Sequence, residues 1–271
     1  MTRAYHGAVS RVGWRSIRTG SGLGVVLSID FTVAKVRGQA GFADLAALLP
    51  EGFATWGTDE DAWAGSGDLR AQLDAWLDRS GQVDSPVRAI FGFCGAAGLA
   101  CALAHRLGGP HTPAVLLFDP VVVGPQNMLA QLTDSLRQLA GPAGQDPEFD
   151  TGVSDEDIAH LDVGEVAEVL TKHYAVRAAE VGAARSIRPS TMADLCRRFE
   201  AYLRYLALCT AAWSRERVRP TLVALSRGHE APAELADAPV VHLDTTQHVL
   251  LGHPDAAKVA TEVLVHATGG G

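Results

Sequence analysis

The sequence has 271 residues, of which 47% are hydrophobic and 20% are charged, as is typical of a globular protein with one large core. Its formal net charge of −8 argues against a nucleic-acid partner, because phosphate binding needs clustered Lys and Arg. No apolar run approaches the ~20 residues of a membrane span or forms the core of a secretory signal, so we expect a soluble, cytoplasmic protein that does not engage a membrane.

Strand and helix patterns alternate through the first half of the chain. The opening arginines are interpreted as part of a basic β-hairpin: Arg3, Arg11, Arg15 and Arg18. Runs of β-branched and aromatic residues predict strands at residues 25–30, 53–57, 87–93 and 114–118. Apolar residues at helical spacing predict helices at residues 41–49, 67–77 and 96–107. This order implies the α/β class, with a mostly parallel sheet and helices on both of its faces.

The pattern becomes helical after Pro125. Apolar residues recur three and four positions apart at residues 128–139, 155–161, 163–174 and 192–213. Strand patterns return at residues 221–225 and 240–243, and a helix at residues 254–267 closes the chain. An insertion between late strands would cover the carboxyl ends of a parallel sheet, where ligands bind. We therefore expect a single domain over residues 1–271 with a helical lid at residues 126–217.

Cys94 lies in the most informative stretch of the sequence, between a predicted strand and a predicted helix. Gly92 and Ala96 stand two residues before and after it, and a nucleophile elbow needs small residues there because its turn is tight and its backbone strained. A helix N-terminus is expected to lower the pKa of Cys94, and the thiolate is the reactive form. The Gly95 amide is placed to donate to an oxyanion. A cysteine simply buried in a Gly-rich turn is the alternative.

A cysteine nucleophile needs a base, and the base usually needs an orienting acid. Asp119 directly follows the fourth predicted strand and is the preferred acid, with Glu230 as its competitor. His248 lies between the last strand and the last helix, where the base of an α/β hydrolase is expected. His253 competes with it, whereas His242 lies inside a strand and is interpreted as structural.

The other cysteines are expected to be core residues: Cys101, Cys196 and Cys209. The sequence contains no CxxC pair, so neither a zinc site nor a disulfide framework is predicted. His229 and Glu230 are adjacent and would point to opposite sides of an extended chain, which makes a poor chelate. We expect no metal and no tightly bound cofactor.

Three motifs, in this order, resemble the thioesterases of nonribosomal peptide and polyketide synthesis: Gly92-Phe93-Cys94-Gly95-Ala96, Leu117-Phe118-Asp119 and His248-Val249-Leu250-Leu251. The resemblance covers most of the chain from about Gly24. It implies an α/β-hydrolase fold, a helical lid between the acid and the base, and a triad of Cys94, His248 and Asp119. It also implies an acyl or peptidyl carrier protein as partner, a substrate held on its phosphopantetheine, and a place in antibiotic or other secondary-metabolite biosynthesis.

Two departures from the family pattern shape the expected chemistry. Cys94 replaces the usual serine, so an acyl group that passes to it from a carrier thioester stays at thioester energy and remains reactive toward amines. The segment that usually supplies an oxyanion donor contains no glycine here, and the backbone N–H of Phe31 or Thr32 is the candidate donor in its place. We expect release of the acyl group to an amine, an internal nucleophile or water. The alternatives are another cysteine hydrolase of the fold, similar to dienelactone hydrolases, and a catalytically silent acyl-binding protein.

Overall fold

The computed structural model describes residues 10–11, 13–31, 38–59, 68–80, 85–108, 112–145, 151–215 and 219–269. The chain divides into two compact units, of which the first joins Met1–Val122 to Ala212–Gly271 and the second comprises Val123–Ala211. The first, here called the α/β unit, contains the sheet. The second, here called the helical unit, is built from helices.

The sheet of the α/β unit has eight described strands in the order β1-β2-β4-β3-β5-β6-β7-β8. Their bounds are β1 Ser10–Arg11, β2 Trp14–Arg18, β3 Gly24–Ile29, β4 Phe53–Thr58, β5 Val87–Phe93, β6 Ala114–Phe118, β7 Leu222–Leu225 and β8 Val240–His242. The hairpin β1–β2 and the pair β2–β4 are antiparallel, and all the other pairs are parallel. This topology is that of the α/β-hydrolase fold, so the predicted fold class is confirmed.

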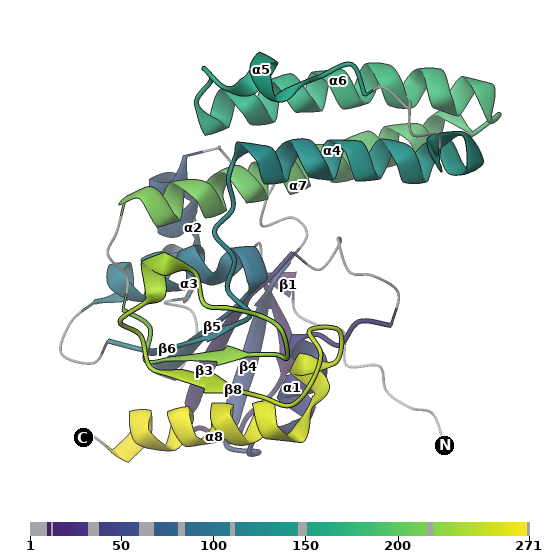
Figure 1. Ribbon diagram of the computed structural model, residues 1–271. Coiled ribbons are helices and arrows are strands. Elements are labelled where there is room, and N and C mark those ends of the chain that lie inside the picture. The colour runs from purple at the N-terminus through teal and green to yellow at the C-terminus, as the bar shows by residue number, and fades with distance from the viewer. Residues whose placement is uncertain are drawn as a thin grey trace, which may run out of the picture. The chain divides into compact units, whose positions relative to one another are not determined.

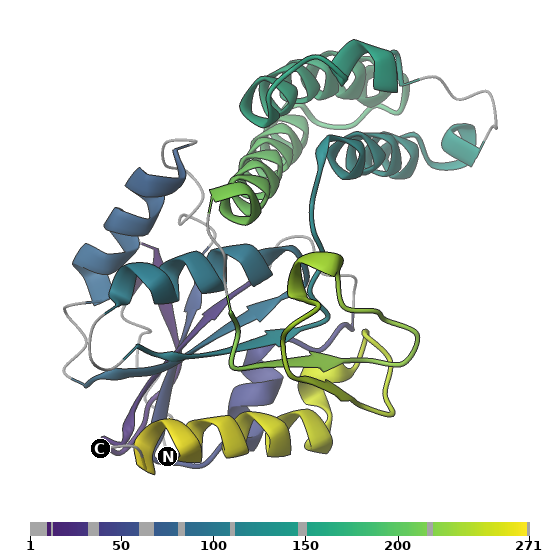
Figure 2. The same ribbon diagram turned by 60° about the vertical axis from the view of Figure 1, so that its left-hand side comes forward.

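Helices cover both faces of the sheet (Figures 1 and 2). Helices α1 (Phe42–Leu48) and α8 (Pro254–Gly269) lie on one face, and α2 (Leu69–Ser80) and α3 (Ala97–Leu107) lie on the other. Because strands covered by helices on both sides have no solvent-facing side, β3 is buried at every position, and its residues are apolar apart from Gly24 and Ser28. The 3-10 turns in the described part of this unit are η3 Cys94–Ala96, η5 Ala233–Leu235 and η6 Leu250–Gly252.

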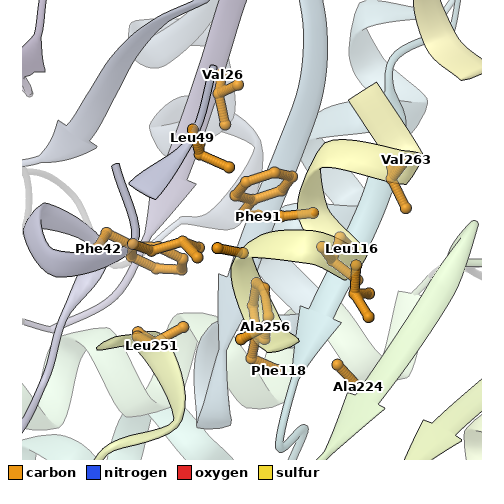
Figure 3. Close-up of a cluster of buried hydrophobic side chains, with 14 of the residues drawn as sticks. Val26, Phe42, Leu49, Phe91, Leu116, Phe118, Ala224, Leu251, Ala256 and Val263 are labelled. Carbon is orange, nitrogen blue, oxygen red and sulfur yellow. The ribbon is translucent and has the colours of Figure 1, made fainter. Parts of the chain in front are cut away.

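Three aromatic rings form the centre of the core between the sheet and helices α1 and α8 (Figure 3). Phe42 of α1, Phe91 of β5 and Phe118 of β6 contact one another with ring centroids 6.0–6.5 Å apart. At this separation tilted and edge-to-face rings attract one another beyond the gain from burial alone. Because Phe91 and Phe118 belong to β5 and β6, this core fixes the two strands that lead to the candidate site.

Arg18, one of the opening arginines, caps the end of helix α1. Its guanidinium donates to the carbonyl of Ala46 and, at 2.7 Å, to that of Leu49, and both carbonyls belong to the last turn and C-cap of α1. Carbonyls at a helix C-terminus lack intrahelical partners and carry a partial negative charge. The hairpin that the sequence predicted is present in β1 and β2, while Arg3 lies outside the described residues.

We expect Arg18→Met to lower the free energy of unfolding by about 1–2 kcal/mol, because two carbonyls lose a charged donor. Urea denaturation followed by circular dichroism measures this change. Arg15→Met is the matched control, since Arg15 lies on the same strand and is exposed. Equal losses of stability in the two variants would show that the cap contributes nothing.

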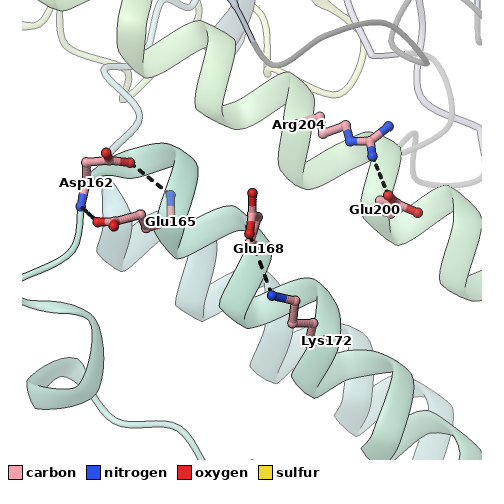
Figure 4. Close-up of polar contacts among 6 residues, drawn as sticks. All are labelled: Asp162, Glu165, Glu168, Lys172, Glu200 and Arg204. Carbon is pink, nitrogen blue, oxygen red and sulfur yellow. Dashed lines mark hydrogen bonds and ion pairs between the residues drawn. The ribbon is translucent and has the colours of Figure 1, made fainter.

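The helical unit is formed by α4 (Pro125–Ala140), α5 (Asp155–Ile158), α6 (Val163–Ala184) and most of α7 (Pro189–Arg215), with a 3-10 turn η4 (Gly141–Gln145) after α4. Asp162 and Glu165 begin α6 with a reciprocal capping box, in which each side chain accepts a 2.9 Å hydrogen bond from the other's backbone N–H (Figure 4). Residue 217, the predicted end of the lid, lies outside the described residues.

The helices of this unit differ in length from their predicted ranges. Helix α6 continues ten residues past Tyr174 to Ala184, because this stretch is rich in alanine and other helix formers but has little apolar periodicity. Helix α5 ends at Ile158, three residues before the predicted end. None of the helices that the structure describes combines the length and the apolar character needed to cross a membrane.

Candidate active site

Cys94 sits at the turn where strand β5 passes into η3 and then into α3. Its φ of +55° places it in the left-handed region, which a side chain other than glycine rarely adopts. Strain of this kind persists only where the surrounding structure enforces it, and it is the conformation of the nucleophile in an elbow between a strand and a helix. The backbone at Cys94 therefore has the geometry that the sequence motif predicts.

The small residues around Cys94 are required by packing. A Cβ atom added at Gly92 would lie 2.9 Å from the Cβ of Ala100 and 3.2 Å from the carbonyl oxygen of Ala96, so strand β5 approaches α3 too closely for a side chain there. Ala96 itself is fully buried. The spacing of small residues around the cysteine thus follows from the close contact of β5 with α3.

Asp119 lies beside Cys94 at the end of the neighbouring strand. Phe93 pairs with Phe118 in the parallel ladder, so the next residue of each strand is Cys94 and Asp119 respectively. The N–H of Val121 donates to the carbonyl of Cys94 at 3.2 Å, which ties the two loops together. Asp119 is fully buried and also has a positive φ, of +43°. The structure therefore brings the predicted nucleophile and the preferred acid together.

The carboxylate of Asp119 is held by Ser226, a residue that the sequence reasoning missed. The backbone N–H of Ser226 donates to Oδ1 at 2.7 Å, and its hydroxyl donates to Oδ2 at 2.6 Å. Ser226 follows β7 directly, as Asp119 follows β6, so its place after a parallel strand was the available signal. The competing acid, Glu230, is exposed in the loop beyond.

His248 is exposed in the turn that precedes η6. Its carbonyl accepts a 2.9 Å hydrogen bond from the N–H of Ala40, and its Nε2 would lie 3.8 Å from a Cβ atom added at Gly38. Leu250 and Leu251 are fully buried and anchor this turn in the core. Among the described residues, no hydrogen bond joins the imidazole of His248 to the preferred acid or to the nucleophile.

Three of the other histidines in the C-terminal part of the chain bear on the choice of the base. His242 ends β8 and is exposed, and His253 accepts a 3.3 Å hydrogen bond from the N–H of Asp255 at the start of α8. His229, which the sequence reasoning considered only as a metal ligand, is half-buried, with Nε2 3.4 Å from the carbonyl oxygen of Pro120. Its ring thus reaches the loop that carries Asp119.

The pKa of the Cys94 thiol is raised, contrary to the expectation from the helix N-terminus. Burial of the sulfur disfavours the thiolate most strongly, the N–H of Gly95 favours it, and the negative charge of Asp119 disfavours it further. The cost of burial therefore outweighs the hydrogen bond from the Gly95 N–H. The backbone N–H of Gly95 contacts the sulfur, and its role as an oxyanion donor stays a prediction.

The second predicted oxyanion donor lies after strand β3. Ile29 pairs with Gly92, so Phe31 and Cys94 occupy corresponding positions two residues further along their strands. Phe31 is 8% exposed and belongs to the described part of the chain, whereas Thr32 lies outside it. The register therefore places the backbone of Phe31 at the same edge of the sheet as the nucleophile.

We expect iodoacetamide to alkylate Cys94 slowly at neutral pH and progressively faster above the ordinary thiol pKa of ~8.5. The raised pKa keeps the thiol protonated at lower pH, and only the thiolate reacts. Peptide mapping of the labelled protein across a pH series gives the rate at Cys94. A rate that already levels off below pH ~8 would instead reveal an imidazolium partner in the free protein.

The remaining cysteines differ in exposure. Cys101 and Cys209 are buried, as predicted, and burial raises the pKa of Cys101. Cys196 of α7 is half-buried, so its prediction as a core residue is wrong. Within the described ranges, no group of three or more His, Cys, Asp or Glu side chains is arranged to hold a metal ion.

Comparison with known proteins gives no match to a family model or to a curated protein. Among solved structures, the chain is similar to the Vlm2 thioesterase domain, with 15% identity over 93% of this chain and 96% of that one and a TM-score of 0.45. An α/β hydrolase fold protein from Nakamurella multipartita has 18% identity over 95% and 96%, with a TM-score of 0.44. A proline iminopeptidase-related protein from Thermus thermophilus has 18% identity over 96% of each chain, with a TM-score of 0.49. Because these identities and TM-scores are low, the fold is assigned from the strand order of the sheet.

Proposed function

We propose that this protein is a thioesterase-like acyl-transfer enzyme with Cys94 as its nucleophile, His248 as its base and Asp119 as the orienting acid. The observation that carries the proposal is the left-handed backbone of Cys94 at a tight turn between a strand and a helix, next to a buried carboxylate. A cysteine that merely filled space would need neither the strained φ nor the acid.

In the first step the thiolate of Cys94 attacks the carbonyl carbon of an acyl thioester. His248 takes the thiol proton, the oxyanion is stabilised by the backbone N–H of Gly95 and of Phe31, and the carbon–sulfur bond of the substrate then breaks. The departing thiolate receives the proton from His248. Because catalytic hydrogen bonds in free enzymes are often long and tighten when substrate binds, His248 engages Cys94 and Asp119 in the substrate complex.

In the second step an amine, a nucleophile within the acyl chain, or water attacks the acyl-enzyme. The incoming group loses its proton to His248, and the carbon–sulfur bond to Cys94 breaks with return of a proton to the sulfur. Since a thioester is exchanged for a thioester in the first step, little acyl-transfer potential is lost and weak nucleophiles such as amines can react. The proposed acyl donor is an acyl or peptidyl carrier protein that holds the substrate on phosphopantetheine. The helical unit of this chain is proposed to serve as a lid.

The test is to supply an acyl N-acetylcysteamine thioester with and without a primary amine, and to separate the acid from the amide by chromatography. We expect release of the thiol to depend on the enzyme, and both the rate of thiol release and the share of amide to rise with amine concentration. Both would rise because a common acyl-enzyme accumulates and its breakdown is the slow step. Absence of enzyme-dependent thiol release would overturn the proposal.

A catalytically silent acyl-binding protein is the second candidate. It is favoured by the raised pKa of Cys94 and by the exposed position of His248. Such a protein would bind the same thioester without releasing thiol. Equilibrium dialysis with the N-acetylcysteamine thioester, run beside the turnover assay, separates this candidate from the enzyme.

A further inference from the structure

Ser226 and Asp119 form a buried pair that joins the ends of strands β6 and β7. Ser226 is 2% exposed and Asp119 is 0% exposed, and two hydrogen bonds from the one residue reach both carboxylate oxygens of the other. An ionised carboxylate buried away from water needs such donors, because desolvation penalises its charge. Ser226 thus supplies the described side-chain partner of the proposed acid.

The two bonds also fix the orientation of the carboxylate. The backbone N–H and the hydroxyl of Ser226 together define the plane of the Asp119 carboxylate. An ionised carboxylate can accept about four hydrogen bonds, so acceptor positions remain for an imidazole. The N–H of Asp119 donates to the carbonyl of Ala224 at 3.0 Å, which anchors the strained backbone of Asp119 to the same strand β7.

The residue after Ser226 extends this arrangement toward the loop of His248. The N–H of Arg227 donates to the carbonyl of Thr245 at 2.7 Å, and its guanidinium contacts the carboxylate of Asp244 at 2.5 and 3.0 Å. Asp244 and Thr245 begin the loop that leads to His248. Two consecutive residues therefore contact both parts of the proposed site. Ser226 binds the carboxylate of Asp119, and Arg227 binds the loop that leads to His248.

We infer that Ser226 is a positioning residue for acyl transfer, which sets the orientation of Asp119 and its distance from the loop that carries His248. The inference rests on the proposed function, because it assigns Ser226 a part in the same reaction. Ser226 does not contact the reacting atoms. It acts through Asp119, so its loss is expected to slow the covalent step and to leave binding of the thioester unchanged.

The experiment measures the first-order rate at which excess enzyme takes the acyl group from an N-acetylcysteamine thioester, as a function of enzyme concentration. We expect Ser226→Ala to lower the limiting rate about 10- to 100-fold, with an unchanged half-saturating concentration, because an orienting hydrogen bond to a charged group is lost. Ser226→Thr keeps the hydroxyl and is expected to recover most of the rate.

Thr221→Val is the matched control. The hydroxyl of Thr221 accepts a 3.0 Å hydrogen bond from the N–H of Val115, between the same two strands but at their opposite ends, and this variant is expected to react at the wild-type rate. Equal rates for Ser226→Ala and wild type would overturn the inference, as would an equal loss in Thr221→Val. If Ser226→Ala does not fold, a Ser226→Thr variant that folds but loses the rate is the contradicting result. Failure of the wild-type protein to accept the acyl group would instead refute the proposed function.

Discussion

Replacing Cys94 with alanine is expected to lower turnover of an acyl thioester by at least about 10³-fold, because the covalent intermediate can no longer form. The substitution removes a single sulfur atom at a half-buried position, so the fold is expected to remain. Thiol release from an N-acetylcysteamine thioester measures the loss, and the thermal unfolding midpoint checks the fold.

Cys101→Ala is the matched control for this variant. Cys101 lies further along the chain, in α3, and is buried in the core. Its replacement is expected to lower the unfolding midpoint while leaving turnover near the wild-type value. Turnover that survives in Cys94→Ala, or falls equally in both variants, would place the reaction elsewhere in the protein.

Asp119→Asn is expected to lower kcat by about 10³-fold, because an amide cannot stabilise the imidazolium that forms during the reaction. The same variant should shift alkylation of Cys94 to lower pH. The negative charge of Asp119 raises the pKa of that thiol, so its removal lowers the pKa and increases the thiolate fraction at a given pH. The substitution is therefore expected to slow turnover and to speed the alkylation of Cys94.

Turnover and alkylation of Cys94 are expected to change in opposite directions in Asp119→Asn, and this distinguishes an orienting acid from other roles of Asp119. If Asp119 acted only by its charge on the sulfur, its removal would raise both the thiolate fraction and the turnover. If it were only structural, both would change in proportion to the loss of folded protein. Iodoacetamide labelling and thiol release, measured on the same preparation, distinguish these outcomes, and a rise in both would contradict the role of orienting acid.

The fold and the elbow were predictable because both arise from local patterns. Alternating strand and helix signals implied a parallel sheet, and small residues around Cys94 implied a close approach that the contact at Gly92 bears out. The place of Asp119 beside Cys94 followed from parallel strands, whose carboxyl ends meet at one edge.

The contacts of the acid and the ionisation of the nucleophile were not predictable in the same way. Ser226 lies 107 residues from Asp119 in the sequence, and only the pairing of β6 with β7 makes them neighbours. The pKa of Cys94 depends on how deeply its sulfur is buried, which the sequence pattern does not reveal. Burial outweighs the hydrogen bond from the Gly95 N–H. Helix α6 extended beyond its predicted end because helix propensity continued after the apolar periodicity had stopped.

The most direct test of the central claim is the intact mass of the protein after brief incubation with an acyl N-acetylcysteamine thioester. An acyl-enzyme on Cys94 predicts a single adduct of the acyl mass on the wild-type chain, its disappearance on addition of a primary amine, and no adduct on Cys94→Ala. A wild-type chain that stays unmodified while thiol is released, or an equal adduct on both chains, would contradict a mechanism through Cys94.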